Sequence, residues 1–350
     1  MFGFRDTALV YLSYVVAGLL VTAVSFALFA LNLRARTALR EKRWRRLSDR
    51  WRAPVLLALT EPSTMDAVHD VIPPRDRLHF VRFVLEYAQR VRGNEREILG
   101  RLAKPYLAPL GERVWSRHSE VRTRAVRTLG MLGLPDHTDE VVGALDDPSP
   151  LVAMIAAKSL ARKEHAEHAA DILLYLKRFE GWSRNFMASM LASIGPDAAP
   201  ALRASLASET EVIWVRAVSA EALRMLRDPY AADTAAQVVE IEEDRELLAS
   251  ALRLLSEVGR PTHVTVVRVR CASPDFVIRS HALTALGIVG GEEDIPRIEE
   301  ALGDESPWVA IHAARALKAA GREDILEELA DAKGPRALLA RQVLSEEVLR

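Results

Sequence analysis

The chain has 350 residues, of which 49% are hydrophobic and 27% are charged, with 17 glycines and 17 prolines. This composition excludes a disordered or collagen-like chain, and the length exceeds what one compact core usually spans. Cys271 is the single cysteine, which excludes an intramolecular disulfide and a multi-cysteine metal site. The net charge of −1 conceals an uneven distribution, because residues 34–52 carry nine basic and two acidic side chains. Residues 53–350 carry 37 basic and 45 acidic side chains, a net charge of −8.

An uncharged segment over residues 7–33 comes first along the chain. As a helix with a rise of about 1.5 Å per residue, these 27 residues are longer than the hydrocarbon core of a bilayer, which is about 30 Å thick. A cleaved signal peptide would instead have an apolar region of about 7 to 15 residues after a basic start. The segment therefore predicts a single-pass transmembrane anchor over residues 1–33. Because the basic residues follow it, we expect the N-terminus outside and the C-terminal body in the cytoplasm.

Residues 34–53 are predicted to form a basic juxtamembrane helix or linker, here called the collar. Its five residues expected at the membrane surface are Arg43, Arg45, Arg46, Arg50 and Arg52. Each basic residue near an anionic lipid surface contributes about 1 kcal/mol of binding. The alternative is that these charges only set the orientation of the anchor. Arginine outnumbers lysine, at 40 of 47 basic residues, and alanine is abundant, which is typical of a GC-rich bacterium and predicts its inner (plasma) membrane.

The rest of the chain repeats every 31 or 32 residues. The equivalent positions that begin each repeat are Val121, Val152, Ser183, Val215, Leu247, Ile278 and Val309, and the eighth residue after each is leucine. Offsets of 0, 4, 8 and 11 share one face of a helix, which we call the stripe. Glycine stands twelve residues on in five of the seven repeats, including Gly195, Gly259, Gly290 and Gly321, and predicts left-handed helix ends.

A second amphipathic segment lies between successive stripes, as in residues 136–147, 197–208 and 291–304. Two such helices cannot bury their apolar faces alone, so successive hairpins must stack. The sequence therefore predicts an all-α protein, in which an N-terminal transmembrane helix precedes an α-solenoid of helical hairpins over residues 54–350.

The segments DDPSPLVAMIAAKSLA (146–161) and DESPWVAIHAARALKAAG (304–321) resemble HEAT repeats, of the short variety also found in phycobilisome-lyase-type proteins. The resemblance covers about residues 75–350 and implies an α-solenoid. An arginine often follows the first stripe position in this family, as at Arg122, Arg184, Arg216 and Arg279. An acid often ends the preceding helix, as at Asp147 and Asp304. The acid and the arginine seldom occur in one repeat, so no continuous Asp–Arg ladder is expected.

His165 and His168 lie three residues apart, which would place them on one face of a helix with Asp171 one turn further on. Such a trio is a candidate metal site. The HExxH spacing of zinc proteases is absent, however, and this segment begins an exposed helix. We therefore favour two surface histidines and predict no bound metal.

Cys271 is the candidate nucleophile, with His263 and His281 as the nearest bases in the sequence. A lone thiol in a helical array is more often a packing residue. The sequence has no phosphate-binding loop, dinucleotide fingerprint or nucleophile elbow. We therefore predict no catalytic residue, no cofactor and no intrinsic enzyme activity.

Tryptophan recurs just before the stripe, at Trp182, Trp214 and Trp308. Equal positions of stacked repeats form a ladder, so these rings could anchor a partner protein. The alternative, which we favour, is that they fill the joints between helices of adjacent repeats. A second row, expected to face the inner groove, adds further candidate partner-binding residues: Arg124, Arg127, Phe186, His281 and His312.

Together these features predict a membrane-anchored scaffold or adaptor that binds a partner protein. The partner would be a membrane-associated protein or enzyme complex, for example a glycosyltransferase. Residues 7–33 would contact the bilayer and the collar anionic lipid. Nucleic acid is not expected, because the body is acidic and shows no basic stripe with stacking aromatic residues. The alternatives are an enzyme of the bilin-lyase type, which the resemblance permits, and a regulatory subunit that responds to lipid or metal.

Overall fold

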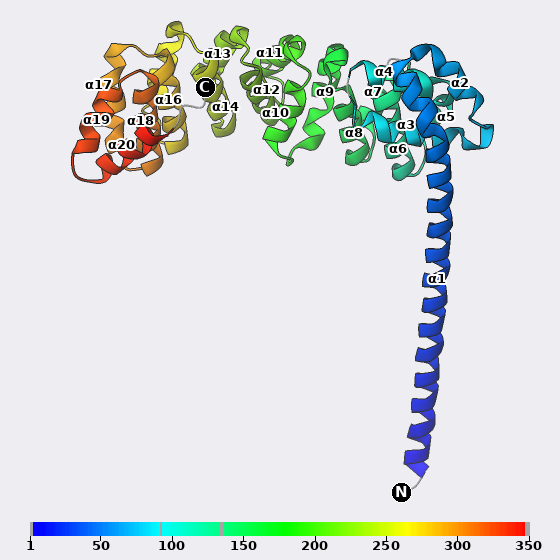
Figure 1. Ribbon diagram of the computed structural model, residues 1–350. Coiled ribbons are helices and arrows are strands. Elements are labelled where there is room, and N and C mark those ends of the chain that lie inside the picture. The colour runs from blue at the N-terminus through cyan, green and yellow to red at the C-terminus, as the bar shows by residue number, and fades with distance from the viewer. Residues whose placement is uncertain (1–2, 92, 134–135, 347–350) are drawn as a thin grey trace. The chain divides into compact units, whose positions relative to one another are not determined.

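The computed structural model describes residues 3–91, 93–133 and 136–346, and every regular element in these ranges is an α-helix or a 3-10 turn (Figure 1). The prediction of an all-α chain of helical hairpins is confirmed. The chain divides into two compact units. Unit 1 contains residues 1–109 and 131–133, and unit 2 contains residues 110–130 and 134–350.

Unit 1 contains helices α1 (Gly3–Thr60), α2 (Met65–Asp70), α3 (Arg77–Ala88) and α4 (Asn94–Ala103). Residues 17–43 of α1 are exposed, whereas its last turns pack on the other helices. There the buried ring of Trp51 meets Phe80 and Phe83 edge-on, with ring centroids 5.5 and 5.7 Å apart. Such edge-to-face contacts suit the charge distribution of aromatic rings. The burial of apolar side chains therefore holds the end of α1 against the other helices of unit 1.

Helix α1 is continuous through the ends of the predicted anchor and collar and through Pro54. From Ala17 onward it is long and apolar enough to cross a membrane. The collar also contacts the protein. Arg43 donates to the buried carboxylate of Asp76 over 2.7 Å, and the Arg82 guanidinium lies 4.5 Å from the centre of the Trp44 ring. Arg43, predicted at the membrane surface, is thus ion-paired within unit 1, although its side chain is still 58% exposed. The other four collar arginines of that prediction are exposed and do not contact Asp76.

In unit 2 the stripes lie on the first helix of each hairpin, and Figure 1 shows α10, α12, α14, α16 and α18 stacked in sequence. These first helices are α6 (Ser119–Leu132), α8 (Pro150–Leu160), α10 (Arg184–Ala192), α12 (Ile213–Leu226), α14 (Arg245–Val258), α16 (Phe276–Val289) and α18 (Pro307–Ala319). The second helices are α7 (Thr138–Gly143), α9 (Ala169–Leu176), α11 (Ala199–Ala207), α13 (Ala232–Ile241), α15 (Val264–Arg270) and α17 (Ile295–Glu300). Helix α5 (Ala108–Arg113) precedes them, and α19 (Glu323–Asp331) and α20 (Pro335–Ser345) follow.

Short 3-10 turns lead into or end many of these helices. They are η1 (Pro62–Thr64), η2 (Pro74–Asp76), η3 (Lys104–Tyr106), η4 (Ala144–Asp146), η5 (Lys163–His168), η6 (Lys177–Phe179), η7 (Pro196–Ala198), η8 (Pro229–Ala231), η9 (Pro261–His263), η10 (Glu292–Asp294) and η11 (Ala301–Gly303). Several of them begin with proline, which lacks the amide hydrogen that the first turn of a helix leaves unpaired.

The stripe is the core of unit 2. Its seven leucines, from Leu129 to Leu317, are all buried. Burial of each contributes about 2 kcal/mol, and a single hairpin has no second apolar face against which to bury them. The repeat period in the sequence is therefore the period of the core.

Glycine brings neighbouring first helices into close contact. A Cβ atom on Gly130 of α6 would lie 2.3 Å from the Ser159 side chain of α8, and one on Gly287 of α16 would lie 2.7 Å from the Ala316 backbone of α18. The sequence predicts small residues four positions into each stripe. These glycines, nine positions in, are a further contact point that the pattern did not reveal.

The helix ends differ from the predicted left-handed glycine caps. Gly195 and Gly321 adopt positive φ angles of 97° and 73°, but Gly259 and Gly290 have φ of −62° and −78°. For the latter two the prediction was wrong. Glycine is needed there for space, because a Cβ would lie 2.4 and 2.6 Å from a carbonyl oxygen one helical turn earlier. At the equivalent position of α12, Arg227 takes the left-handed conformation instead, with φ of 52°.

Candidate partner-binding surface

Three positions of each repeat lie about 100° around the helix from the buried stripe. They are the residue just before the stripe and the residues three and six positions after its start. We call this ladder along the first helices of unit 2 the repeat face. Its aromatic side chains differ in exposure. Trp182 is 42% exposed, Phe186 43% and Trp308 51%, whereas Trp214 is mostly covered. The exposed rings, and not Trp214, are therefore available to a partner.

Each exposed tryptophan contacts one aromatic neighbour and remains about half exposed. The Trp182 ring meets Phe179 edge-on with centroids 5.8 Å apart, and the Trp308 ring lies 5.0 Å from His312. A ring held on one side has already lost much of its rotational freedom. Trp182 and Trp308 are thus pre-oriented, as binding anchors commonly are.

Besides these rings, further apolar residues near the starts of the first helices are exposed, which the sequence pattern did not indicate. We call the exposed set the apolar edge; it consists of Leu151, Trp182, Phe186, Val212, Ile213, Phe276 and Trp308. Val212, Ile213 and Phe276 lie two or three positions before the stripe begins. An apolar residue between the acid or serine that starts a helix and its first stripe residue is the signal that could have found them.

Charged side chains fill the middle of the repeat face. Glu221 of α12 is 2% exposed, and its carboxylate accepts hydrogen bonds from Arg253 of α14 over 2.7 Å and from Arg224 over 2.9 Å. Arg253 also donates to the Ser250 hydroxyl over 2.9 Å. Burial opposes ionisation of Glu221, but the two guanidinium groups outweigh it and hold its pKa below the ordinary value. Glu221 is therefore a buried carboxylate.

The histidines of the repeat face continue this polar network. Arg253 donates to Nε2 of His281 over 3.1 Å, and burial together with this guanidinium lowers the pKa of His281 to about 4. His312 lies with its ring centroid 6.0 Å from that of His281 and meets the Thr284 hydroxyl over 2.8 Å. Burial and Arg315 lower its pKa as well. Both rings are partly buried, and their lowered pKa values keep them neutral at pH 7.

The row three positions after the stripe start does not face a groove throughout, as the sequence led us to expect. Arg124 and Phe186 are exposed, but Val218 and Ser250 are fully buried. The expectation was wrong for the middle of unit 2, because neighbouring first helices cover this row there. Arg127, three residues beyond Arg124, is exposed.

Arginine–acid pairs connect the two helices of several hairpins. Arg122 binds both carboxylate oxygens of Asp147 over 2.6 and 2.8 Å, and Arg279 binds those of Asp304 over 2.9 and 2.8 Å. Each arginine reaches the acid that follows it at the end of its own hairpin. The predicted mismatch was therefore wrong, because it paired each arginine with the acid before it. Arg184 departs from this pattern and binds Glu246.

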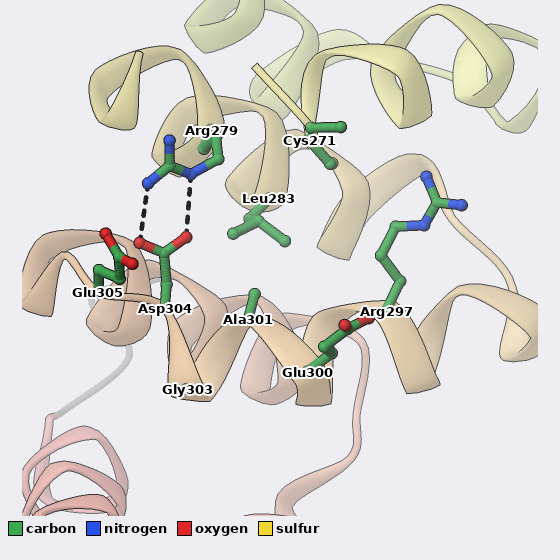
Figure 2. A pocket seen from close by; sticks show the side chains of 10 residues that line it. Cys271, Arg279, Leu283, Arg297, Glu300, Ala301, Gly303, Asp304 and Glu305 are labelled. Carbon is green, nitrogen blue, oxygen red and sulfur yellow. Dashed lines mark hydrogen bonds and ion pairs between the residues drawn. The ribbon is translucent and has the colours of Figure 1, made fainter. Parts of the chain in front are cut away.

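A cavity of about 590 Å³ lies between α16 and the segment from α17 to η11, with Cys271, Leu283, Arg297 and Asp304 among its lining residues (Figure 2). Burial raises the pKa of the Cys271 thiol to about 12. A thiol with this pKa is protonated at neutral pH and is a poor nucleophile. The nearest base in the sequence, His263, uses its two ring nitrogens on Asp233 and the Arg260 amide.

The candidate metal pair does not lie on one helix face. His165 and His168 belong to the 3-10 turn η5, and His165 has non-helical φ and ψ of −132° and 32°. That prediction of local structure was wrong. His168 bonds instead to Asp171 over 2.8 Å. Among the residues that the structure describes, no group of three His, Cys, Asp or Glu side chains is placed to hold a metal ion.

Residues 107–178 and 232–318 match HEAT repeats, in agreement with the resemblance seen in the sequence. No curated protein matches the chain. Among solved structures, it is similar to the complex of CpcE and CpcF of phycocyanin lyase from Nostoc, with 17% identity over 67% of this chain and 85% of that chain and a TM-score of 0.34. Human deoxyhypusine hydroxylase in complex with glycerol shares 21% identity over 68% and 94%, with a TM-score of 0.29. A designed armadillo repeat protein shares 15% over 68% and 99%, with a TM-score of 0.32.

Proposed function

We propose that this chain of HEAT repeats is a membrane-anchored scaffold that holds a partner protein on the apolar edge and catalyses no reaction itself. The observation that carries the proposal is the exposure of three large aromatic rings: Trp182 just before α10, Phe186 on α10 and Trp308 on α18. Buried aromatic anchors dominate the free energy of most protein interfaces. An exposed row of apolar side chains along one ladder is a feature of interaction surfaces.

Helix α1 supports the membrane part of the proposal. Its exposed apolar residues have no partner within the described structure, and a bilayer would cover them. The basic collar after the span favours a cytoplasmic body and the inner membrane of a bacterium. Four collar arginines, Arg45, Arg46, Arg50 and Arg52, remain exposed for anionic headgroups. Confinement to the membrane would raise the effective concentration of a membrane-associated partner, which needs no catalysis.

The bilin-lyase-type alternative has one observation in its favour, the cavity beside Cys271. The raised pKa of that thiol opposes a nucleophilic role. The polar groups around it also engage one another, since Arg279 binds Asp304 across the cavity wall (Figure 2). We therefore prefer the scaffold.

The test is crosslinking followed by mass spectrometry in native membranes, with the wild type compared with a Trp182→Ala/Phe186→Ala variant. Loss of two interface anchors should reduce crosslinked partner at least about tenfold, because hot-spot truncations cost about 2 kcal/mol or more. Melting should change little, because both rings are nearly half exposed. The control is Tyr230→Ala, which removes an exposed aromatic ring away from the apolar edge. Unchanged capture in the double variant, or a large fall in melting temperature, would contradict the proposal.

A further inference from the structure

Positive charge without an ion-pair partner gathers at the first two helices of unit 2. Arg127 of α6 and Lys158 of α8 occupy the same position, six residues after the stripe start, and Arg124 lies one turn before Arg127. All three side chains are exposed, and none forms an ion pair with a residue that the structure describes. Their charge is therefore available to a ligand.

The same ladder position is neutralised further along the chain. Arg253 of α14 binds the Glu221 carboxylate, and Arg315 of α18 binds Glu346 over 2.7 and 2.9 Å. Equal positions in the repeat thus carry a paired cation at the C-terminal end of unit 2 and an unpaired one at its N-terminal end. The unpaired cations at this position belong to α6 and α8, and the repeat pattern alone does not require them to be unpaired.

Helices α6, α8 and α10 are neighbours. The backbones of α6 and α8 meet where Gly130 faces Ser159, and Ser193 at the end of α10 donates to the Ala161 carbonyl at the end of α8 over 3.2 Å. Because equal positions of stacked repeats form a row, the cations of α6 and α8 and the rings of Trp182 and Phe186 occupy corresponding positions of successive repeats.

We call the repeat-face residues of these three helices the α6–α10 patch. It consists of Glu120, Arg124, Arg127, Leu151, Ile155, Lys158, Trp182, Phe186 and Ser189. Three cations and one carboxylate give it a net charge of +2. The corresponding positions of α12, α14 and α16 have a net charge of −1, from Glu221, Glu246 and Arg253. The patch is thus a positive, aromatic-bearing area on a body whose net charge is −8.

We infer that the α6–α10 patch binds an acidic segment of a partner protein that carries at least one large apolar side chain. The inference rests on the proposed scaffold function and names the chemistry of its partner. Unpaired cations attract carboxylates and fix the register, and the exposed faces of Trp182 and Phe186 accept the apolar side chain. An anionic bilayer fits less well, because the net charge of −8 on the body opposes its close approach.

The test uses the full chain in nanodiscs of zwitterionic lipid and a fluorescein-labelled helical peptide that carries glutamates, leucine and phenylalanine together on one face. Fluorescence anisotropy should show binding that weakens as salt rises. An Arg127→Glu/Lys158→Glu variant should bind about tenfold more weakly, because two attractive contacts become repulsive. The matched control, Arg101→Glu/Lys333→Glu, reverses one exposed arginine and one exposed lysine elsewhere and should bind like the wild type.

Three results would overturn the inference. The first is no binding of the peptide, or equal binding of a peptide with lysine in place of glutamate. The second is equal loss in the patch variant and its control. The third is protection of the Lys158 amine from acetylation in anionic but not in zwitterionic nanodiscs, which would assign the patch to lipid.

Crosslinking in native membranes separates this inference from the scaffold proposal. If Trp182→Ala/Phe186→Ala abolishes capture but Arg127→Glu/Lys158→Glu does not, the scaffold stands and the acidic partner is wrong. If neither variant reduces capture, both are wrong. If both reduce it while the control variant does not, the captured protein should carry an acidic and apolar segment at the crosslinked site.

Discussion

Glu221 is the most informative single residue to perturb in unit 2. Its carboxylate is 2% exposed and accepts hydrogen bonds from Arg253 and Arg224. Glu221→Gln keeps the size of the side chain and removes the charge. Loss of one partner from a buried ion pair costs about 3 to 5 kcal/mol. Because Arg253 and Arg224 are 31% and 29% exposed and water can solvate them, we expect a smaller loss, about 2 kcal/mol of unfolding free energy.

The effect should depend on pH with a definite sign. Two guanidinium groups, acting against burial, lower the pKa of folded Glu221 below its ordinary value of 4.5. A carboxylate with a lowered folded pKa stabilises the protein fully above its unfolded pKa and loses that contribution as pH falls through the folded pKa. The wild type and Glu221→Gln should therefore differ most above about pH 5 and converge in acid.

Hydrogen exchange read by mass spectrometry measures this locally, which suits a stack of repeats whose stability is a sum of neighbour terms. Glu221→Gln should speed exchange in α12 and α14 and leave α18 nearly unchanged. The matched control is Glu257→Gln, since Glu257 is one-third exposed and lies 3.5 Å or more from its arginine partners. That exposed contact is worth about 0.5 kcal/mol. Equal effects of the two substitutions, or a difference that does not shrink as the pH falls below 4.5, would refute the reasoning.

Three further outcomes are expected. At pH 8 the native Cys271 thiol, with a pKa of about 12 in place of 9.0, should react with a disulfide reagent about 1,000-fold more slowly than in urea, and comparable rates would contradict its burial. The wild type should lose stability as pH falls from 6.5 towards 4, because the unfolded chain gains a proton that folded His281 does not bind, and His281→Gln should flatten this slope in acid denaturation curves. Gly287→Ala should lower the melting temperature by an amount equivalent to about 2 kcal/mol, since its Cβ would lie 2.7 Å from the Ala316 backbone, whereas a stabilised variant would show that α16 and α18 can separate.

The hairpin array could be predicted from the sequence because its signal is local. A leucine eight residues into every stripe, such as Leu160 or Leu255, must be buried whenever the segment is helical. For this feature the helical period alone places the side chain. The exposure of Trp182 and Trp308 could not be predicted in this way, because Trp182 precedes α10 and Trp214, at the equivalent position, is mostly covered.

Other features depend on how one hairpin meets the next, and a single repeat does not contain that information. At Gly259, for example, a Cβ would lie 2.5 Å from the Val289 side chain at the end of the next first helix, α16. Val218 and Ser250 are covered by neighbouring first helices, although Phe186 at the equivalent position is exposed. Such contacts require the coordinates.

The unbroken course of α1 has a mechanical consequence. If the apolar span ends at Leu33, the ten residues to Arg43, where the helix first binds unit 1, form a stiff spacer of about 15 Å at about 1.5 Å per residue. A flexible tether of the same length would let unit 1 sample many heights and tilts above the headgroups. A helical strut instead holds unit 1 at one standoff distance, so a protein that contacts unit 1 would have to reach about that far from the bilayer.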